Sequence, residues 1–563
     1  MTTPSPLLWQ RTIRSAAPGL AAALLFSLAL SVLMLAVPLY SLQLFDRVLG
    51  SGHVETLLLL TLILCLTLAV LAGLDAVRTS LLARVGTRFA AGLERPLLEA
   101  CLAGGLAGRN LAGQHFRDLA TVRQAVAGPA VSALFEAPWL PLAVAAIWLL
   151  HPDLGLFAVA CAVALWLLAL LNEALTQRSL ARAGDLALDT QGQADALARR
   201  ADAVQAMGML PTLASRFAAA SGAALVLQQQ AAERSGVLMG LTRATRLLAQ
   251  AGVMGLGAWL VVRHELTPGG MMAASILLGR ALAPVEQLLG AWRHLAAARL
   301  GAQRLRTALG EAGERAAAMP LPAPSGRLAL ERVTVANPAG GRPILSRIAC
   351  ALEPGTLLAV VGPSGAGKST LCRLLAGCVQ PSDGTARMDG VDLRHLDRAA
   401  IGRHVGYLPQ DPSLFAGTIA RNIARMAEAP DPAAVVQAAR LAGVHELILR
   451  LPEGYDTVLA DGGAPLSAGQ RQRVALARAV HGDPCLVVLD EPNASLDAAG
   501  DQALQEALKA LKARGATVVM VTHRPHALQL ADLVMVLEEG AVSRLGPREQ
   551  VIAPLLRPSA RAA

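Results

Sequence analysis

One long stretch without a charged side chain constrains this chain more than any other feature. Between Arg14 and Asp46 there is no Asp, Glu, Lys or Arg. An α-helix needs about 20 predominantly apolar residues to cross a bilayer, so the stretch predicts a membrane span. It is too long for a cleavable signal peptide, and a second apolar run begins at Thr56. The N-terminal part of the chain is therefore expected to stay in the membrane.

Five more charge-free apolar runs follow the first one. They lie between Glu55 and Asp75, Glu136 and Asp153, Asp153 and Glu173, Arg246 and Arg263, and Glu265 and Arg280. The last two, taken alone, could be buried helices of a soluble domain, but they complete an even set of six spans. The sixth run stops at Arg280, so this helix either ends early or carries Arg280 and Glu286 along a path through the membrane.

Composition supports a membrane protein. Of the 563 residues, 54% are hydrophobic and 16% are charged, whereas soluble domains average about 25% charged residues. So apolar a chain is not intrinsically disordered. The net charge of +9 comes with no Lys/Arg block that contains interleaved aromatic residues, so we expect no nucleic-acid partner. The seven Cys contain no Cys-x-x-Cys pair, which argues against a disulfide framework or a zinc site.

The arginines predict the orientation of the spans. The short turns between paired spans carry only Arg47 and Arg263, whereas the other flanks carry Arg11, Arg14, Arg78, Arg84, Arg88, Arg178, Arg182, Arg243, Arg246, Arg293 and Arg299. By the positive-inside rule, the short N-terminus (1–15) and both long loops (about 76–130 and 174–242) are cytoplasmic. The loops are rich in Ala, Leu, Arg and Gln, which predicts helical rods with a break near 104–113 and near 208–211. We expect a six-span domain over 16–310.

A Pro-rich segment predicts a domain boundary. Residues 319–326 (MPLPAPSG) mark a linker, taken as 311–326, and a second domain over 327–563. Strand-like runs then alternate with helical ones, at 328–335, 357–361, 405–408, 486–489, 518–521 and 533–537. This alternation indicates an α/β domain with a largely parallel sheet.

A phosphate-binding motif follows one of these strand-like runs. Residues 362–369 match G-x-x-x-x-G-K-[ST] in the required setting, after a strand and before a helix. Backbone N–H groups and the helix N-terminus would hold phosphate oxygens. Lys368 would neutralise the β- and γ-phosphates of ATP, and Ser369 would ligate Mg²⁺. The ATP-binding residues expected here are Gly362, Pro363, Ser364, Gly365, Ala366, Gly367, Lys368, Ser369 and Thr370.

Two adjacent carboxylates end a buried strand about 120 residues later. Asp490 would hold Mg²⁺ through water, and Glu491 would be the general base that orients the attacking water. Many strands end in Asp, so the inference depends on the phosphate loop in the same domain.

Residues 466–470 (LSAGQ) resemble the signature of the ATP-binding cassette family. The resemblance implies that Ser467, Gly469 and Gln470 bind the ATP held by a partner subunit, so that two cassettes enclose two ATP molecules. It also implies that Gln410, in the Q-loop, touches Mg²⁺, and that Asp497, in the D-loop, belongs to the ATP site. His523 resembles the switch histidine of the family, which contacts the γ-phosphate. Two positions depart from the family: Ala468 in the signature, and Asn337 where an aromatic residue usually stacks on adenine.

Six spans followed by a cassette resemble an exporter half-transporter, which implies a homodimer. Residues 407–411 (YLPQD), 439–456, 490–497 (DEPNASLD) and 522–525 (THRP) look like the type I secretion permease-ATPases of the PrtD (protease-exporter) branch. The resemblance implies export of unfolded polypeptides with a C-terminal signal across the bacterial inner membrane, among membrane lipids. It also implies a periplasmic membrane-fusion adaptor and a TolC-like outer-membrane channel as partners. The short N-terminus leaves no room for the peptidase-like domain of other branches.

Two other functions remain open from the sequence. The first is a lipid or drug exporter of the same architecture. The second is a membrane regulator that binds nucleotide without turning it over, which would be expected to lack the base or the switch histidine. Both Glu491 and His523 are present, which argues against the regulator.

Overall fold

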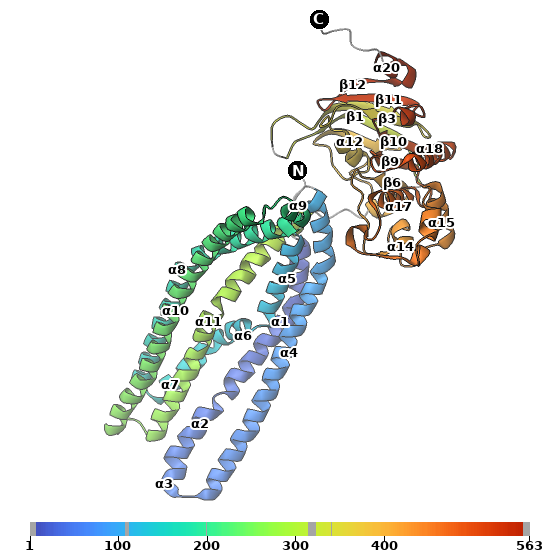
Figure 1. The fold of residues 1–563 in the computed structure, drawn as a ribbon. Coiled ribbons are helices and arrows are strands. Elements are labelled where there is room, and N and C mark those ends of the chain that lie inside the picture. The colour runs from blue at the N-terminus through green and yellow to red at the C-terminus, as the bar shows by residue number, and fades with distance from the viewer. Residues whose placement is uncertain (1–6, 107–111, 199, 313–322, 339, 556–563) are drawn as a thin grey trace. The chain divides into compact units, whose positions relative to one another are not determined.

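The computed structural model describes residues 7–106, 112–198, 200–312, 323–338 and 340–555. They belong to two compact units, Met1–Glu314 and Arg315–Ala563 (Figure 1). Part of the predicted N-terminus (1–6), the middle of the predicted break at 104–113 and most of the predicted linker (313–322) lie outside the described residues.

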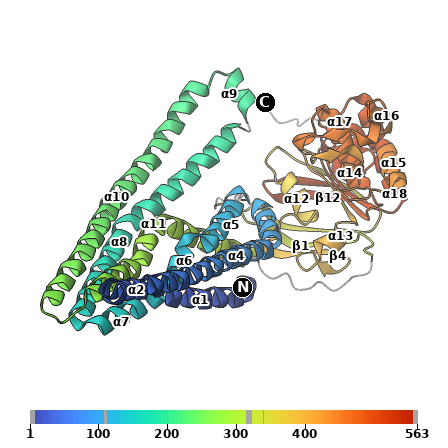
Figure 2. The same cartoon turned by 90° about the horizontal axis from the view of Figure 1, so that it is seen from below.

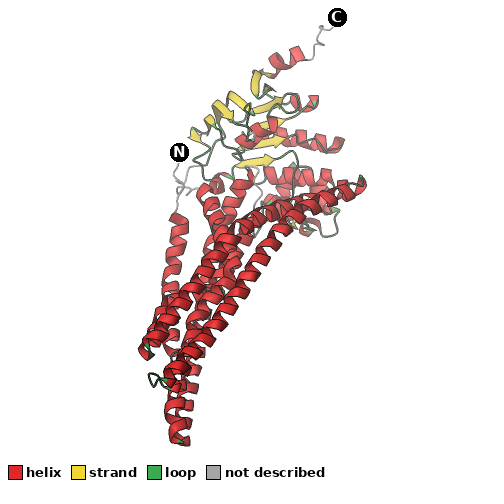
Figure 3. Cartoon of the chain, turned by 90° about the vertical axis from the view of Figure 1, so that its left-hand side faces the viewer, coloured by secondary structure: helices red, strands yellow, loops and turns green. Residues whose placement is uncertain are grey.

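The described part of the N-terminal unit is helical, as the red ribbons of Figure 3 show. Its α-helices are α1 (Leu7–Leu33), α2 (Ala36–Gln43), α3 (Leu49–Ser51), α4 (Val54–Leu106), α5 (Ala112–Ala127), α6 (Pro129–Glu136), α7 (Leu140–Leu150), α8 (Pro152–Ala198), α9 (Ala201–Ala206), α10 (Leu210–Val262) and α11 (Pro268–Ala312). A π-helical turn, Leu44–Val48, links α2 to α3, and a 3₁₀ turn, Ala137–Trp139, links α6 to α7. Six stretches are long and apolar enough to span a membrane.

The long helices pack in pairs over apolar contacts. Helices α8 and α10 run side by side (Figure 2), and α1 packs on α4. A buried cluster that includes Ile147, Leu154, Val253, Leu260 and Leu278 joins α7, α8, α10 and α11. A second buried cluster, with Phe89, Leu93, Leu119 and Leu305, joins α4, α5 and α11. Close van der Waals packing of these side chains contributes to holding the helices together.

The sixth span does not end at Arg280. Helix α11 continues through Arg280 and Glu286 as one helix to Ala312. Glu286 is neutralised by Arg246 of α10, whose guanidinium lies 2.9 Å from the carboxylate. An early end of the helix, which the sequence left open, is therefore wrong.

The C-terminal unit contains two main sheets. Its strands are β1 (Leu328–Val335), β2 (Leu345–Leu352), β3 (Leu357–Val361), β4 (Asp383–Met388), β5 (Val391–Asp392), β6 (Val405–Leu408), β7 (Gly417–Thr418), β8 (Val458–Leu459), β9 (Leu486–Asp490), β10 (Thr517–Val521), β11 (Leu533–Glu538) and β12 (Ala541–Pro547). The larger sheet has the order β12-β11-β3-β10-β9-β6, and within it only the edge pair β11–β12 is antiparallel. An antiparallel sheet, β2-β1-β4-β5, accompanies it.

The helices of this unit are α12 (Lys368–Leu375), α13 (Arg398–Ile401), α14 (Ile419–Ile423), α15 (Pro432–Leu441), α16 (His445–Leu449), α17 (Ala468–Val480), α18 (Ala498–Ala513), α19 (Pro525–Leu528) and α20 (Arg548–Leu555). Of these, α12, α17, α18 and α20 pack against the larger sheet. Successive residues of β3 enter different cores: Leu357 packs in one cluster and Leu358 in another. Both faces of the sheet are therefore buried at its centre, which explains why the central strands β3, β9 and β10 are nearly continuous apolar runs.

Candidate nucleotide site

The phosphate loop lies between β3 and α12. Gly362 has φ +154°, and a Cβ there would lie 2.1 Å from the carbonyl oxygen of Leu537. Gly367 has φ +95°, and its Cβ would meet the carbonyl oxygen of Ile344 at 2.9 Å. Only glycine fits at these two positions, because neighbouring backbone occupies the space of a side chain. Pro363, Ser364, Gly365 and Ala366 complete the loop, and Ser369 and Thr370 follow Lys368 in the first turn of α12.

The ammonium group of Lys368 is hydrogen-bonded to the backbone of its own loop. Its Nζ donates hydrogen bonds to the carbonyl oxygens of Gly362, at 2.7 Å, and Pro363, at 2.8 Å. The residue is 7% exposed. The ammonium group is therefore held within the loop whose backbone N–H groups could surround a phosphate.

Asp490 lies beside this loop at the end of β9. The residue is 2% exposed, and its Oδ1 has no hydrogen-bond partner among the described residues. Burial raises the pKa of this carboxyl, and a hydrogen bond with Ser369 acts in the opposite direction. A buried carboxylate oxygen without a donor is costly unless a cation or water reaches it.

Three polar side chains converge at the carboxyl ends of neighbouring parallel strands. Gln410 follows β6, Glu491 follows β9 and His523 follows β10. The amide Nε2 of Gln410 donates to Oε2 of Glu491 at 3.2 Å. His523 Nε2 lies 3.9 Å from Oε1 of the same carboxylate. The carboxyl ends of such strands are where α/β folds bind ligands.

The signature residues lie at the N-terminus of α17. Ser467 and Gln470 form a reciprocal capping box: the Ser467 N–H donates to Gln470 Oε1 at 2.8 Å, and the Gln470 N–H donates to Ser467 Oγ at 3.3 Å. A Cβ on Gly469 would lie 2.8 Å from the carbonyl oxygen of Ser495. Ala468 is exposed. Within the described chain, no hydrogen bond joins Ser467, Gly469 or Gln470 to the phosphate loop.

Gln472 was missed by sequence reasoning. It is 3% exposed, and its Nε2 donates to the carbonyl oxygens of Glu491, at 3.2 Å, and Pro492, at 2.6 Å. Its Oε1 accepts from the N–H of Ser495 at 2.9 Å. Gln472 thus ties the signature helix to the segment after Glu491. The sequence offered one signal for Gln472: it lies about one turn into a helix that begins with a capping motif.

Asp497 caps α18. Its carboxylate accepts a hydrogen bond from the N–H of Gly500 at 2.8 Å and pairs with Arg473 of α17. The Gly500 hydrogen bond is the main cause that lowers the pKa of Asp497. The sequence did not single out Arg473, whose ion pair links the signature helix to the segment that contains Asp497.

The position expected to hold an adenine-stacking aromatic lies between β1 and β2. Asn337 occupies it, and its carbonyl oxygen accepts from the N–H of Gly340 at 2.9 Å. Ile344 lies at the other end of the same β1–β2 connection, and its carbonyl oxygen borders Gly367. The β1–β2 connection therefore lies next to the phosphate loop.

Comparisons with known proteins agree with this fold. Residues 345–494 match the model of the ABC transporter family. The chain is 41% identical, over 94% of its length and 92% of the relative, to the type I secretion system ATP-binding protein PrsD of Rhizobium meliloti. It is 31% identical to the cyclolysin secretion/processing ATP-binding protein CyaB of Bordetella pertussis, over 94% of this chain and 75% of the relative.

A solved structure has the same fold. A bacterial Atm1-family ABC exporter with ATP bound superposes with a TM-score of 0.82, over 95% of this chain and 97% of that one, at 23% sequence identity. Six membrane-spanning stretches and an α/β P-loop unit define an ABC exporter, which confirms the predicted fold class. More narrowly, the chain belongs to the ATP-binding proteins of type I secretion systems. It is a multi-pass membrane protein that binds ATP and couples its hydrolysis to export.

Proposed function

We propose that this chain exports unfolded polypeptides, recognised by a C-terminal signal, across the bacterial inner membrane. The observation that carries the proposal is the 41% identity to a type I secretion ATP-binding protein over nearly the whole chain. That similarity spans the membrane helices as well as the cassette. The N-terminus and the cassette are proposed to be cytoplasmic, in accord with the arginine-rich flanks of the spans.

The nucleotide site is proposed to divide its tasks among the converging side chains. Lys368 and the glycine-rich loop bind the β- and γ-phosphates, Glu491 orients the attacking water, and His523 contacts the γ-phosphate. Mg²⁺ fits beside Ser369, Gln410 and Asp490, and the unpartnered Oδ1 of buried Asp490 supports that fit. Bound there, the metal would neutralise developing phosphate charge.

The chain is proposed to act as a homodimer. Ser467, Gly469, Gln470 and Asp497 would contact the ATP held by the second copy, since within one described chain the signature forms no hydrogen bond with the phosphate loop. A periplasmic membrane-fusion adaptor and a TolC-like outer-membrane channel would carry the cargo onward. The relative from Bordetella pertussis, a cyclolysin secretion/processing ATP-binding protein, supports a polypeptide cargo.

The test compares proteins in the culture supernatant of cells that express the gene, lack it, or carry Glu491→Gln. Loss of one or a few polypeptides in the last two strains is expected, with rescue by the active gene alone. An unchanged supernatant, in cells shown to make the protein, would overturn polypeptide export in favour of a lipid or small-molecule cargo.

A further inference from the structure

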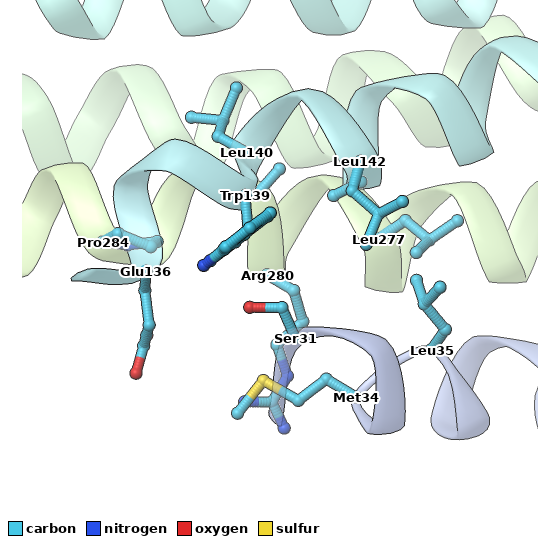
Figure 4. Close-up of a pocket in the computed structure, with 12 residues that line it drawn as sticks. Ser31, Met34, Leu35, Glu136, Trp139, Leu140, Leu142, Leu277, Arg280 and Pro284 are labelled. Atoms are coloured by element: carbon cyan, nitrogen blue, oxygen red, sulfur yellow. The ribbon is translucent and has the colours of Figure 1, made fainter. Parts of the chain in front are cut away.

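A cavity of about 60 Å³ opens among the membrane helices of the N-terminal unit. It lies between α1, the start of α7 and α11 (Figure 4). Most of its wall is apolar, but Arg280 and Glu136 border it, together with Ser31, Met34 and Trp139. Ionisable side chains beside a cavity inside a membrane domain need a functional explanation.

Arg280 stands at the middle of its span. The sixth membrane-spanning stretch runs from Pro268 to Trp292, so Arg280 is the central residue of 25. The side chain is exposed, and its nearest recorded partner is Met34 Sδ, 3.9 Å from a guanidinium nitrogen. An arginine is costly in contact with lipid at the bilayer centre. The face of α11 that carries Arg280 therefore borders an aqueous path.

The other cations of this region already have carboxylate partners. Arg78 lies 2.7 Å from both Asp75 and Glu136, and Arg246 lies 2.9 Å from Glu286. Glu136 shares the cavity with Arg280, but its Oε1 accepts from Arg78. Among the described residues, no carboxylate lies within ion-pair distance of Arg280. The cavity thus contains a cation that the chain itself does not neutralise.

The same residue also has a backbone acceptor without its usual helical donor. Pro284 lies inside α11 and lacks the N–H that would bond to the carbonyl oxygen four residues earlier, which is that of Arg280. Pro284 lines the cavity too. A carbonyl oxygen without this helical donor and a guanidinium at one residue suit a ligand that offers both N–H groups and carboxylates. A polypeptide that contains Asp or Glu is such a ligand.

The volume of the cavity and its depth in the membrane argue against a small molecule or a lipid phosphate as its ligand. Pockets for small molecules usually measure about 300–1,000 Å³, whereas this one measures about 60 Å³ and matches a single side chain. Lipid phosphates lie at the membrane surface, far from the middle of a span. We infer that Arg280 binds Asp and Glu side chains of the exported polypeptide as they pass the middle of the membrane.

This inference rests on the proposed polypeptide export, and the experiment separates the two. The full chain in lipid nanodiscs, without nucleotide, is titrated against two short fluorescent Gly/Ser peptides that differ only in carrying Asp or Asn at the same positions. Wild type is expected to bind the Asp peptide about tenfold more tightly, with a preference that falls as salt rises. Arg280→Gln is expected to remove the preference and Arg280→Lys to keep part of it. The matched control is Arg263→Gln in the turn before α11, where the guanidinium stacks on Trp259 at 4.1 Å.

A charge reversal provides a test that an unfolded variant cannot imitate. Arg280→Glu is expected to prefer a peptide with Lys at the same positions. Equal binding of the Asp and Asn peptides by wild type would overturn the inference and leave polypeptide export intact. A preference that survives Arg280→Gln would overturn it as well, and binding of neither peptide would count against the proposed function itself.

Discussion

The side-chain amide of Gln472 donates a hydrogen bond to the carbonyl oxygen of Pro492 at 2.6 Å. Through this bond, and a second one to the carbonyl oxygen of Glu491, the signature helix α17 is fixed to the segment that carries the proposed base. Any movement of α17 would therefore shift the backbone at Glu491. The buried side-chain amide of Gln472 thus links the signature helix to the base segment, although the two are separate in sequence.

Gln472→Ala is expected to lower the rate of ATP hydrolysis without preventing ATP binding. The change removes three hydrogen bonds and leaves buried backbone groups without partners. A misplaced base costs about tenfold or more in kcat. Steady-state hydrolysis by the purified chain measures this, with Gln502→Ala on the exposed face of α18 as the control. An unchanged kcat would show that α17 holds its place without Gln472.

Glu491→Gln is expected to abolish hydrolysis and retain ATP, because the amide keeps the hydrogen-bonding shape but cannot act as a base. Retained nucleotide and dimer, measured after gel filtration with ATP, are the readouts. Exposed Glu506→Gln in α18 is the matched control. Sustained hydrolysis in Glu491→Gln would reject the assignment of the base.

Lys368→Ala is expected to weaken ATP binding by about tenfold to a hundredfold. This loss of affinity corresponds to the charge-assisted hydrogen bonds that the ammonium group of Lys368 would donate to the phosphates. Equilibrium binding of a fluorescent ATP analogue gives the Kd, and Lys509→Ala, exposed on α18, controls for loss of positive charge. If the two variants bind ATP equally well, the phosphate loop has been misinterpreted.

Asp118→Ala is expected to destabilise the packing of α5 on α11 by about 2 to 3 kcal/mol, because it leaves the partly buried Arg304 without its partner. Nε and Nη2 of that guanidinium donate to Asp118, at 2.8 and 2.6 Å, and these bonds raise the pKa of Arg304. The apparent Tm of the detergent-solubilised chain reports the loss. Glu99→Ala, which breaks an exposed pair with Arg95, should cost less than about 1 kcal/mol. Equal shifts in Tm for Asp118→Ala and Glu99→Ala would contradict the expectation that the more buried ion pair contributes more to stability.

Cys350 in β2 is expected to resist alkylation at neutral pH. Burial disfavours the thiolate and raises the pKa of this thiol to about 11. Because the raised pKa favours the neutral form, the native thiolate should be about a hundredfold rarer than in the unfolded chain until the pH approaches that value. Mass spectrometry of iodoacetamide adducts, native against unfolded, measures the difference. Equal rates in both states would contradict it.

Much of the fold could be predicted because its signals are local. The runs at 357–361, 486–489 and 518–521 fall on β3, β9 and β10, since central strands buried on both faces are nearly continuous apolar runs. The antiparallel strands β2, β4 and β12 were missed. Exposed or half-buried residues interrupt the buried ones in β2 and β4, and β12 has no buried residue, so none of the three strands is a continuous apolar run.

By itself, the sequence determined six spans, a phosphate loop and the residues Gln410, Glu491 and His523, because span length and glycine spacing are properties of neighbours along the chain. Only the tertiary structure decided that Gln410 and His523 approach one carboxylate and that Gln472 holds α17 to the base segment. It also decided that Arg246 neutralises Glu286, while Arg280 has no carboxylate partner among the residues that the structure describes. Those relationships join residues far apart in the chain, and they depend on which strands and helices pack together. Contacts of that kind have no periodic signature in the sequence.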